Sequence, residues 1–270
     1  MTTVRAKKNL GQHFLKDKGI AEMIVNSLQA NNVNKVLEIG PGMGVLTELL
    51  LKKESFETWA VEIDRESVDY MKIHFPQLSE RIITSDFLRM RLDQLFDEPF
   101  AIIGNFPYNI SSQIFFRVLE YRDHIPEIVG MLQKEVAQRL ANGPGSKAYG
   151  ILSVFLQAYY NIEYLFTVNE DVFSPPPKVK SGVIRLTRNQ KEKLECDEKQ
   201  FFGIVKMAFN QRRKTMRNSL KSRIISDELK ANPIFDKRPE QLGVAEFEMV
   251  TRLICEQESN SAGDSKSPVE

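Results

Sequence analysis

Cysteine and histidine are scarce in this chain of 270 residues. The two cysteines, Cys196 and Cys255, lie far apart and form no Cys-x-x-Cys pair. This pattern argues against a disulfide framework and against a structural zinc site. The three histidines, His13, His74 and His124, are too scattered along the sequence to indicate a metal site. We therefore expect no bound metal.

Long apolar runs and a strong excess of one charge are also missing. The longest apolar stretch, 151–160, is too short to cross a bilayer, which takes roughly 20 residues. The basic, polar amino terminus lacks the apolar core of a signal peptide. We therefore expect a cytoplasmic protein that does not contact membranes. Because the formal net charge is only +1, nucleic-acid binding has to rest on local clusters of charge.

The first two-thirds of the chain alternate between strand-like and helix-like segments. Five apolar runs are typical of buried strands, at 36–39, 58–63, 81–85, 100–104 and 128–132. Helical spacing of apolar residues separates them, at 45–53, 68–75 and 111–119. Such alternation indicates a parallel sheet covered on both faces. Two more strand candidates, 162–168 and 182–186, can extend one edge of the sheet in the antiparallel sense. We predict an α/β protein with a mostly parallel, seven-stranded, Rossmann-like sheet.

The composition changes near 187–199, which is polar and highly charged, and the chain beyond it has a helical pattern at 199–209, 214–223 and 245–257. We predict an α/β domain over 1–188 and a small all-helical domain over 189–257. The last residues, 258–270, are mostly small or polar, and we predict a disordered tail there.

A glycine-rich turn, GPGMG at 40–44, follows the first strand and precedes a helix. Glycines such as Gly40 and Gly42 let the backbone approach a ligand and adopt positive φ, the geometry of nucleotide binding at the end of a parallel strand. The turn can also serve only to pack the helix on the strand. Its spacing differs from the dinucleotide fingerprint. Glu38, just before the turn, would repel a pyrophosphate but suits the cationic, amino-acid end of a ligand.

Carboxylates also follow the next two strands. Glu62 ends the second strand, where an acidic side chain can accept hydrogen bonds from two ribose hydroxyls. Asp86 follows the third strand, where it can bind an adenine amino group. Each alone can be an ordinary surface or capping carboxylate. Their succession at consecutive strand ends favours a cofactor site.

The fourth strand ends in Asn105-Phe106-Pro107-Tyr108. An adenine amino nitrogen is a poor nucleophile because its lone pair is delocalised into the ring. Two acceptors that hold its hydrogens, the Asn105 side-chain oxygen and the Phe106 carbonyl, would free that lone pair. Pro107 restricts Phe106 to extended geometry, and Tyr108 can stack on an unstacked base. A turn with buried aromatic residues is the alternative interpretation.

A proline-rich segment, FSPPPKV at 173–179, precedes the last strand candidate. Its prolines favour a rigid, extended conformation. It can be a linker or a ligand for another domain. We predict instead that it presents Phe173 over the active site.

One basic segment stands out in the helical region. Residues 206–223 contain seven Lys or Arg and no acid, including Arg212, Arg213, Lys214 and Arg217. Clustered positive charge of this kind is an electrostatic footprint for a phosphate backbone. A solvated helix face is the alternative, although such faces usually carry both signs of charge. We predict that this segment binds RNA.

With these motifs in order, the sequence closely resembles the small-subunit ribosomal RNA adenine dimethyltransferases, the KsgA/RsmA family. The resemblance runs from about Lys8 into the helical region and rests on segments at 9–15, 38–42, 105–108, 132–135, 143–150 and 173–181. It implies S-adenosylmethionine as cofactor, with His13, Leu15, Gly40, Glu62, Asp86 and Asn105 in contact with it. Position 13 is often Asn in the family, and the residue at position 106 is often Leu.

The resemblance implies dimethylation of N6 on two adjacent adenosines in a hairpin loop near the 3′ end of 16S ribosomal RNA, with a role in small-subunit biogenesis. We expect the enzyme to act as a monomer. A resistance-type methyltransferase of large-subunit RNA has the same catalytic motifs and remains an alternative. A non-catalytic assembly factor is less consistent with an intact Glu62, Asp86 and Asn105, and a DNA adenine methyltransferase is a weaker option.

Overall fold

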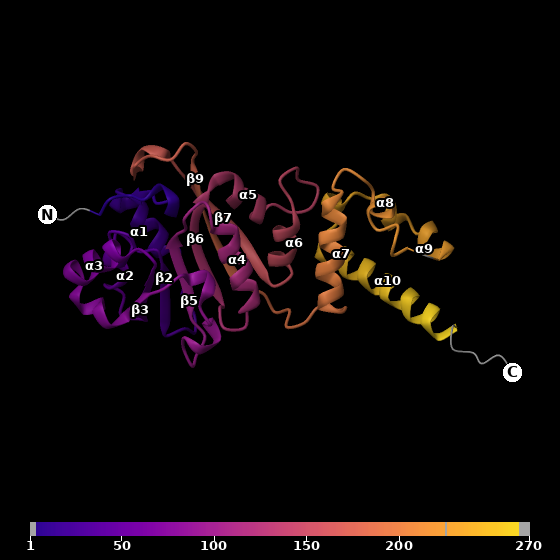
Figure 1. Cartoon of the computed structure of the whole chain (residues 1–270), viewed down its shortest axis with the longest axis horizontal. Helices are drawn as coiled ribbons and strands as arrows, with labels where there is room; N and C mark the ends of the chain where they lie inside the picture. Colours follow the sequence, from indigo (N-terminus) through magenta and orange to yellow (C-terminus); the bar gives the residue numbers. More distant parts are fainter. Residues whose placement is uncertain (1–3, 225, 265–270) are drawn as a thin grey trace. The chain divides into compact units, whose positions relative to one another are not determined.

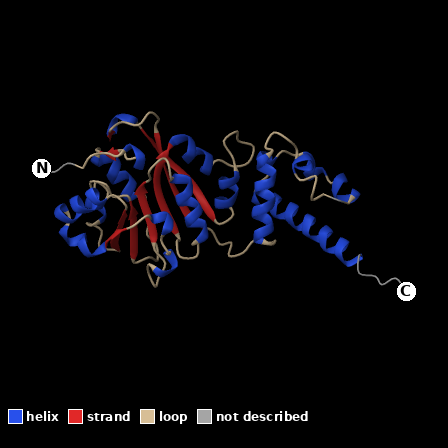
Figure 2. Cartoon of the chain, viewed as in Figure 1, coloured by secondary structure: helices blue, strands red, loops and turns tan. Residues whose placement is uncertain are grey.

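A computed structural model describes residues 4–224 and 226–264 of the chain. The chain divides into two compact units. The first comprises the residues up to 141 together with 160–189, and the second comprises 142–159 together with the residues from 190 on. Figure 2 shows that the strands belong to the first unit and that the second is built from helices and loops.

The first unit is organised around a seven-stranded sheet, in the order β4-β3-β2-β5-β6-β9-β7 (Figure 1). Its strands are β2 (Lys35–Ile39), β3 (Glu57–Glu62), β4 (Ile82–Thr84), β5 (Ala101–Asn105), β6 (Glu127–Gln133), β7 (Tyr160–Val168) and β9 (Ser181–Arg188). The pairs from β4 to β6 are parallel, and β9 runs antiparallel to both β6 and β7. All seven predicted strands are confirmed, and so is the predicted fold class.

The order of the strands creates a switch point between β2 and β5. From β2 the chain continues to β3 and β4 on one side, and then returns to form β5 and β6 on the other. Connections from these two neighbours therefore leave in opposite directions and open a crevice at the carboxyl ends of the strands.

Helices cover both faces of the sheet because successive strand residues point to opposite sides. The helices of this unit are α1 (Lys18–Asn26), α2 (Thr47–Leu50), α3 (Arg65–His74), α4 (Ser111–Glu120) and α5 (Lys134–Ala141). On one face, Ile24 of α1 joins Ile103 and Val129 in an apolar cluster. The neighbouring strand residues Ile102 and Ile128 are also fully buried and point to the opposite face.

A second, two-stranded sheet ties distant segments together. It pairs β1 (Phe14–Leu15) with β8 (Phe173–Ser174) in the antiparallel sense. The backbone N–H of Lys16 also donates to the Val172 carbonyl at 2.8 Å. This pairing brings the segment before α1 beside the proline-rich segment, which the sequence did not predict.

The second unit contains α6 (Ile151–Gln157), α7 (Glu198–Asn210), α8 (Met216–Ser219), α9 (Asp227–Ala231) and α10 (Val244–Asp264). The sequence assigned 142–159 to the first domain, and the structure groups these residues with the second unit instead. The reason is aromatic packing, because the Phe155 ring of α6 lies 4.4 Å from the Phe202 ring of α7 and 6.4 Å from that of Phe201, measured between centroids.

The predicted disordered tail, 258–270, needs correction as well. Helix α10 continues to Asp264, past the predicted end at residue 257. Arg223 pairs with Glu258 on this helix at 2.5 Å, which ties the extra turn to the rest of the unit. Residues 265–270 lie outside the described part of the chain. Within the described part, no helix is both long enough and apolar enough to cross a membrane.

Candidate active site

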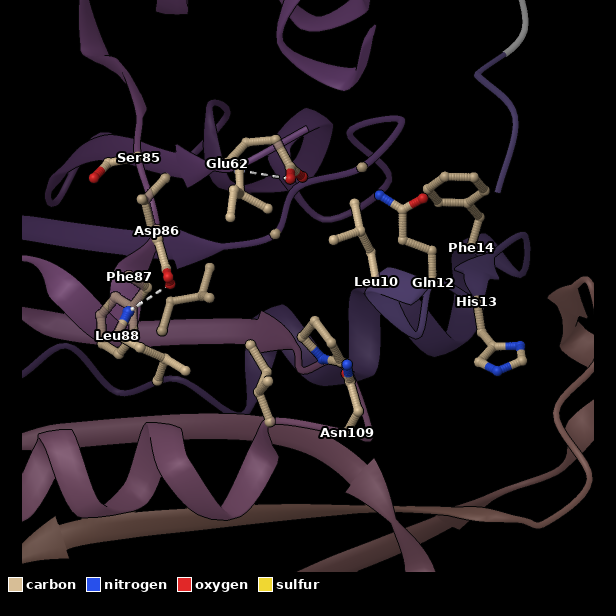
Figure 3. A pocket seen from close by; sticks show the side chains of 17 residues that line it. Leu10, Gln12, His13, Phe14, Glu62, Ser85, Asp86, Phe87, Leu88 and Asn109 are labelled. Atoms are coloured by element: carbon tan, nitrogen blue, oxygen red, sulfur yellow. Dashed lines mark hydrogen bonds between the residues drawn. The ribbon is translucent and has the colours of Figure 1, made fainter. Parts of the chain in front are cut away.

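The carboxyl ends of β2, β3, β4 and β5 border a pocket of about 190 Å³ at the switch point. Residues 10–14, which precede and begin β1, complete its wall (Figure 3). The predicted site residues that line this pocket are His13, Gly40, Gly42, Glu62, Asp86 and Pro107. The sheet therefore brings together side chains that the sequence placed at four separate strand ends.

The glycine turn leaves room above its backbone. Gly40 has φ +66°, and a Cβ built there would meet nothing within 4 Å, so the space over this residue is open. Gly42 has φ +56°, and a Cβ there would lie 2.8 Å from the Phe14 ring. A positive φ favours glycine at both positions. Gly40 thus forms an open cradle, whereas Gly42 lets Phe14 approach the turn.

Glu62 lies at the end of β3 and is almost fully buried, with 5% of its surface exposed. Its Oε1 atom accepts hydrogen bonds from the backbone N–H groups of Ile63, at 2.8 Å, and Asp64, at 2.9 Å. Burial nevertheless raises the pKa of the Glu62 carboxyl. These bonds fix the carboxylate at the pocket wall (Figure 3).

Asp86 follows β4 and performs the capping role that the sequence left open. Its Oδ1 atom accepts a hydrogen bond from the Leu88 N–H at 3.0 Å and so caps a short 3-10 helix, Phe87–Arg89. The same residue lines the pocket. The cap orients the carboxylate there, so capping and ligand binding are compatible at this position (Figure 3).

Glu38 is buried beneath the glycine turn, beside a second and smaller pocket. This pocket is lined by Glu38, Leu15 and Asn105, among others, and Phe14 lines both pockets. The Thr47 hydroxyl donates to Glu38 Oε2 at 2.5 Å. Burial raises the pKa of Glu38 to about 7, and the nearby charge of Glu62 adds to this effect. A cation beside these two unpaired carboxyl groups would favour their ionised forms and lower their pKa values, so the site suits a cationic ligand.

The Asn105 side chain at the end of β5 is held in one orientation. Its Nδ2 atom donates to the backbone carbonyl of His13 at 2.8 Å. An amide whose nitrogen is engaged in this way presents its oxygen as an acceptor on the other side. The His13 ring turns elsewhere, and its Nδ1 atom bonds the Pro175 carbonyl at 2.8 Å. The backbone of His13, rather than its ring, therefore orients Asn105.

The three residues after Asn105 occupy different environments. The Phe106 ring is buried against Phe115 of α4, with 5.9 Å between centroids. Pro107 lines the larger pocket. The Tyr108 hydroxyl forms a hydrogen bond with the Ser181 hydroxyl at 2.6 Å, and burial raises the pKa of Tyr108. Because its ring is buried, Phe106 can act at the site only through its backbone, which is the role predicted for it.

The ribosomal RNA adenine dimethylase family matches residues 3–246, most of the chain. The chain belongs to this family. The predicted resemblance is therefore confirmed, and with it the enzyme class: an S-adenosylmethionine-dependent methyltransferase that dimethylates adenine in ribosomal RNA.

Individual relatives are similar over nearly their whole length. The chain is 58% identical to the ribosomal RNA small subunit methyltransferase A of Flavobacterium johnsoniae, covering 94% of this chain and 97% of that one. It is 59% identical to the protein of the same name from Cytophaga hutchinsonii, covering 94% and 99%.

Solved structures have the same fold. A dimethyladenosine transferase from Plasmodium falciparum matches with a TM-score of 0.75 at 23% identity, over 93% of this chain and 98% of that one. The 23S rRNA methyltransferase ErmE matches with a TM-score of 0.67 at 25% identity, over 88% and 99%.

In this dimethylase, Phe173 does not lie open above the pocket as the sequence predicted. Its side chain is buried, with 1% of its surface exposed, and belongs to the same apolar cluster as Leu15 and Val168. The β1–β8 pairing sets Phe173 directly opposite Leu15, which is also buried. The ring therefore packs in the core in this conformation, because strand pairing turns it away from solvent.

The four cations predicted to bind RNA also differ among themselves. Arg212 donates to the Lys147 carbonyl at 2.6 Å, and Arg217 forms two hydrogen bonds with Asp236, at 3.0 and 2.6 Å. Arg213 and Lys214 are exposed and form no ion pair with any described residue. Two of the four are therefore engaged within the second unit, and two are free to meet a phosphate.

Several residues that line the larger pocket were missed by the sequence argument. Ile63 is apolar yet 51% exposed, and Leu88 lies beside Asp86. Such side chains can pack on a flat, apolar ring. Leu10 and Gln12 belong to the segment at 9–15, where only positions 13 and 15 were assigned. The pairing of β1 with β8 brings them close to the glycine turn and to the carboxylates at the strand ends.

The described residues contain no group of three His, Cys, Asp or Glu side chains that could hold a metal ion.

Proposed function

We propose that this dimethylase acts on small-subunit ribosomal RNA and methylates N6 of two adjacent adenosines in a hairpin loop near the 3′ end, twice each. The relatives named ribosomal RNA small subunit methyltransferase A support this choice of subunit, since identity reaches 59% over 94% of the chain. Because those relatives are bacterial, the reaction on this proposal takes place in the cytoplasm during small-subunit biogenesis.

The residues at the switch point fit S-adenosylmethionine. The open cradle over Gly40 admits a ligand against the backbone, and two buried carboxyl groups favour a cation. On this proposal Glu62 accepts hydrogen bonds from the ribose hydroxyls, Asp86 binds the adenine amino group, and Glu38 faces the cationic amino-acid end. When bound, the cofactor supplies an electrophilic methyl group on a sulfonium.

Asn105 is the main basis for the proposed contact with the amino group of the target adenine. Its amide nitrogen is bonded to the His13 carbonyl, so its oxygen can accept one hydrogen of the adenine amino group. The Phe106 carbonyl accepts the other, and its ring stays buried. Tyr108, anchored by Ser181, stacks on the base. These contacts aim the nitrogen lone pair at the methyl group, so the reaction depends mainly on positioning.

The proposal is tested by incubating the enzyme and S-adenosylmethionine with isolated, unmethylated small and large subunits. Mass mapping of the RNA then identifies the modified adenosines. We expect dimethyladenosine at two adjacent positions of the small-subunit RNA and none in the large-subunit RNA. Methylation of large-subunit RNA alone would establish the resistance-type activity instead.

We propose further that the enzyme is a monomer. We also propose that it needs no metal, because a sulfonium methyl group is already electrophilic. The exposed large apolar side chains among the described residues are spread over separate elements, for example Met23 on α1, Phe116 on α4 and Met249 on α10. Light scattering should give a mass close to 31.0 kDa. Methylation of a purified RNA hairpin should survive a chelator.

A further inference from the structure

A third pocket of the first unit, with a volume of about 480 Å³, lies at the carboxyl end of β6. It is bordered by the first turn of α5 and by the segment that leads into β9, and its lining includes Lys134, Lys178 and Lys180. This pocket shares no lining residue with the two pockets beside the glycine turn. The cofactor and target-base contacts described above therefore leave it unused.

The three lysines of this pocket have no acidic partner in the part of the chain that the structure describes. No carboxylate of any described residue lies within ion-pair distance of them. Lys178 and Lys180 are exposed, and Lys134 is partly buried. The backbone N–H of Lys134 donates to the Lys180 carbonyl at 2.9 Å, which holds the two chain segments together. Three unpaired ammonium groups around one hollow favour an anion, and the positive end of the α5 dipole favours it too.

The pocket adjoins the residues proposed to hold the target base. Ser181, which bonds the Tyr108 hydroxyl at 2.6 Å, directly follows Lys180. Ser181 also lies opposite Gln133 in the β6–β9 pairing, and Gln133 lines the pocket. An RNA strand whose adenosine stacks on Tyr108 would therefore pass its neighbouring phosphates close to these lysines.

Two acids of the pocket help to identify the ligand. Glu135 is paired with Arg139 at 3.0 Å, so its charge is largely offset. Glu170 also lines the pocket and forms no ion pair with a described residue, although its Oε2 atom is itself buried. A free anion would be repelled by that carboxylate, whereas a ribose brings a 2′-hydroxyl that can donate to it. An RNA backbone therefore suits the pocket better than a small anion does.

We propose that this lysine pocket binds the RNA backbone next to the target adenosine, with phosphate on Lys134, Lys178 and Lys180 and a 2′-hydroxyl on Glu170. The inference rests on the proposed function, because it places the pocket's ligand on the same RNA strand as the methylated base.

The test measures binding of a labelled RNA hairpin, with the target loop sequence, at several salt concentrations. The variant Lys178→Ala/Lys180→Ala should bind roughly fivefold to tenfold more weakly per lost contact at about 0.1 M salt, and its salt slope should fall by about 0.7–0.9 per contact. S-adenosylmethionine binding should be unchanged, which also verifies the fold. The matched control is Lys53→Ala/Lys72→Ala, which removes the same charge near α2 and α3 and should leave RNA affinity nearly unaltered.

A second arm uses the same hairpin with 2′-deoxy nucleotides flanking the target adenosine. The wild-type enzyme should prefer the all-ribose hairpin, and Glu170→Ala should lose most of that preference. If the lysine variant matches its control in affinity and slope, or Glu170→Ala keeps the full preference, the inference is overturned. Neither result affects the mapping of methylated adenosines with the wild-type enzyme. That experiment tests the proposed function independently of this pocket.

Discussion

Glu38 and Glu62 are buried carboxyl groups on adjacent strands, and neither forms an ion pair with a described Lys or Arg. Two such carboxyl groups do not stabilise the free protein, because burial without a partner of opposite charge disfavours the ionised form. Their arrangement becomes favourable once a cationic ligand is present. We therefore regard the two residues as binding groups whose cost to the free protein is recovered in the complex.

The affinity of the enzyme for its cofactor should depend on pH through Glu38. The pKa of Glu38 is about 7 in the free protein, and a bound cation should lower it. Cofactor affinity should then rise as pH increases from 5.5 towards 7 and level off above that, with a proton released on binding below pH 7. Each pKa unit of lowering adds about tenfold to the difference in affinity. Calorimetry in buffers of different ionisation enthalpy measures both quantities.

Glu38→Gln is the matched control for this pH profile. It keeps the shape of the side chain and removes the titrating group, so its affinity should be lower at pH 7.5 and nearly independent of pH. A wild-type affinity that stays constant from pH 5.5 to 7.5 would show that no cation lies near Glu38.

The second prediction concerns the other two carboxylates. Glu62→Gln and Asp86→Ala should each weaken S-adenosylmethionine binding by roughly 1–3 kcal/mol, since each leaves polar groups of the ligand without a partner. Asp69→Ala, which removes an exposed acid from α3, serves as the control. Affinities equal to the wild type in both site variants would remove these residues from the cofactor site.

At the scale of elements, β5 and β6 support the turn that carries Asn105. The Phe106 ring fills the room left by two glycines of these strands. A Cβ at Gly130 would lie 2.4 Å from the ring, and one at Gly104 would lie 3.0 Å from it. The sheet surface is therefore shaped to this ring, which explains how the Phe106 side chain is accommodated.

This packing predicts a coupled pair. Gly130→Ala should lower the free energy of unfolding by roughly 1–3 kcal/mol, as overpacking does, and should slow methylation by moving the Phe106 carbonyl. Adding Phe106→Leu makes the side chain smaller and should restore part of the free energy of unfolding and part of the methylation rate. Denaturant unfolding and single-turnover rates on the two single variants and the double variant provide the cycle. Effects that simply add would show that the ring and the glycine are independent.

The cations of the basic segment divide into those bonded within the second unit and those that are exposed and unpaired among the described residues. Arg213→Ala/Lys214→Ala should flatten the salt dependence of RNA binding by about one unit per lost contact and leave stability nearly unchanged. Arg212→Ala should instead lower the free energy of unfolding by about 1 kcal/mol, because it removes the bonds to the loop at 146–147. Arg217→Ala should behave like Arg212→Ala, since Asp236 holds that side chain. Equal loss of slope in all the variants would contradict this division.

At the scale of the whole molecule, sequence reasoning succeeded where a local pattern determines the outcome. Strand periodicity placed β2 to β5 correctly, and the rule that parallel strands end at one edge gathered Gly40, Glu62 and Asp86 around one pocket. Its errors involve partners distant in the chain. Whether Phe173 lies over the active site or in the core depends on its pairing with Leu15. The bond between Arg212 and the carbonyl at residue 147 was likewise not foreseen, while the RNA-binding role of Arg212 stays a prediction. A one-dimensional pattern contains neither partner.

On the function proposed above, the enzyme catalyses methyl transfer mainly by orienting an adenine amino group through Asn105. The most direct measurement is the single-turnover methylation rate of Asn105→Ala at saturating S-adenosylmethionine and RNA, where weaker binding of either cannot lower the rate. We predict a rate reduced on the order of a hundredfold or more, as for the loss of one well-placed polar group, with RNA affinity almost unchanged. A variant that methylates at the wild-type rate under these conditions would contradict the account and leave Asn105 with a purely structural role in the turn.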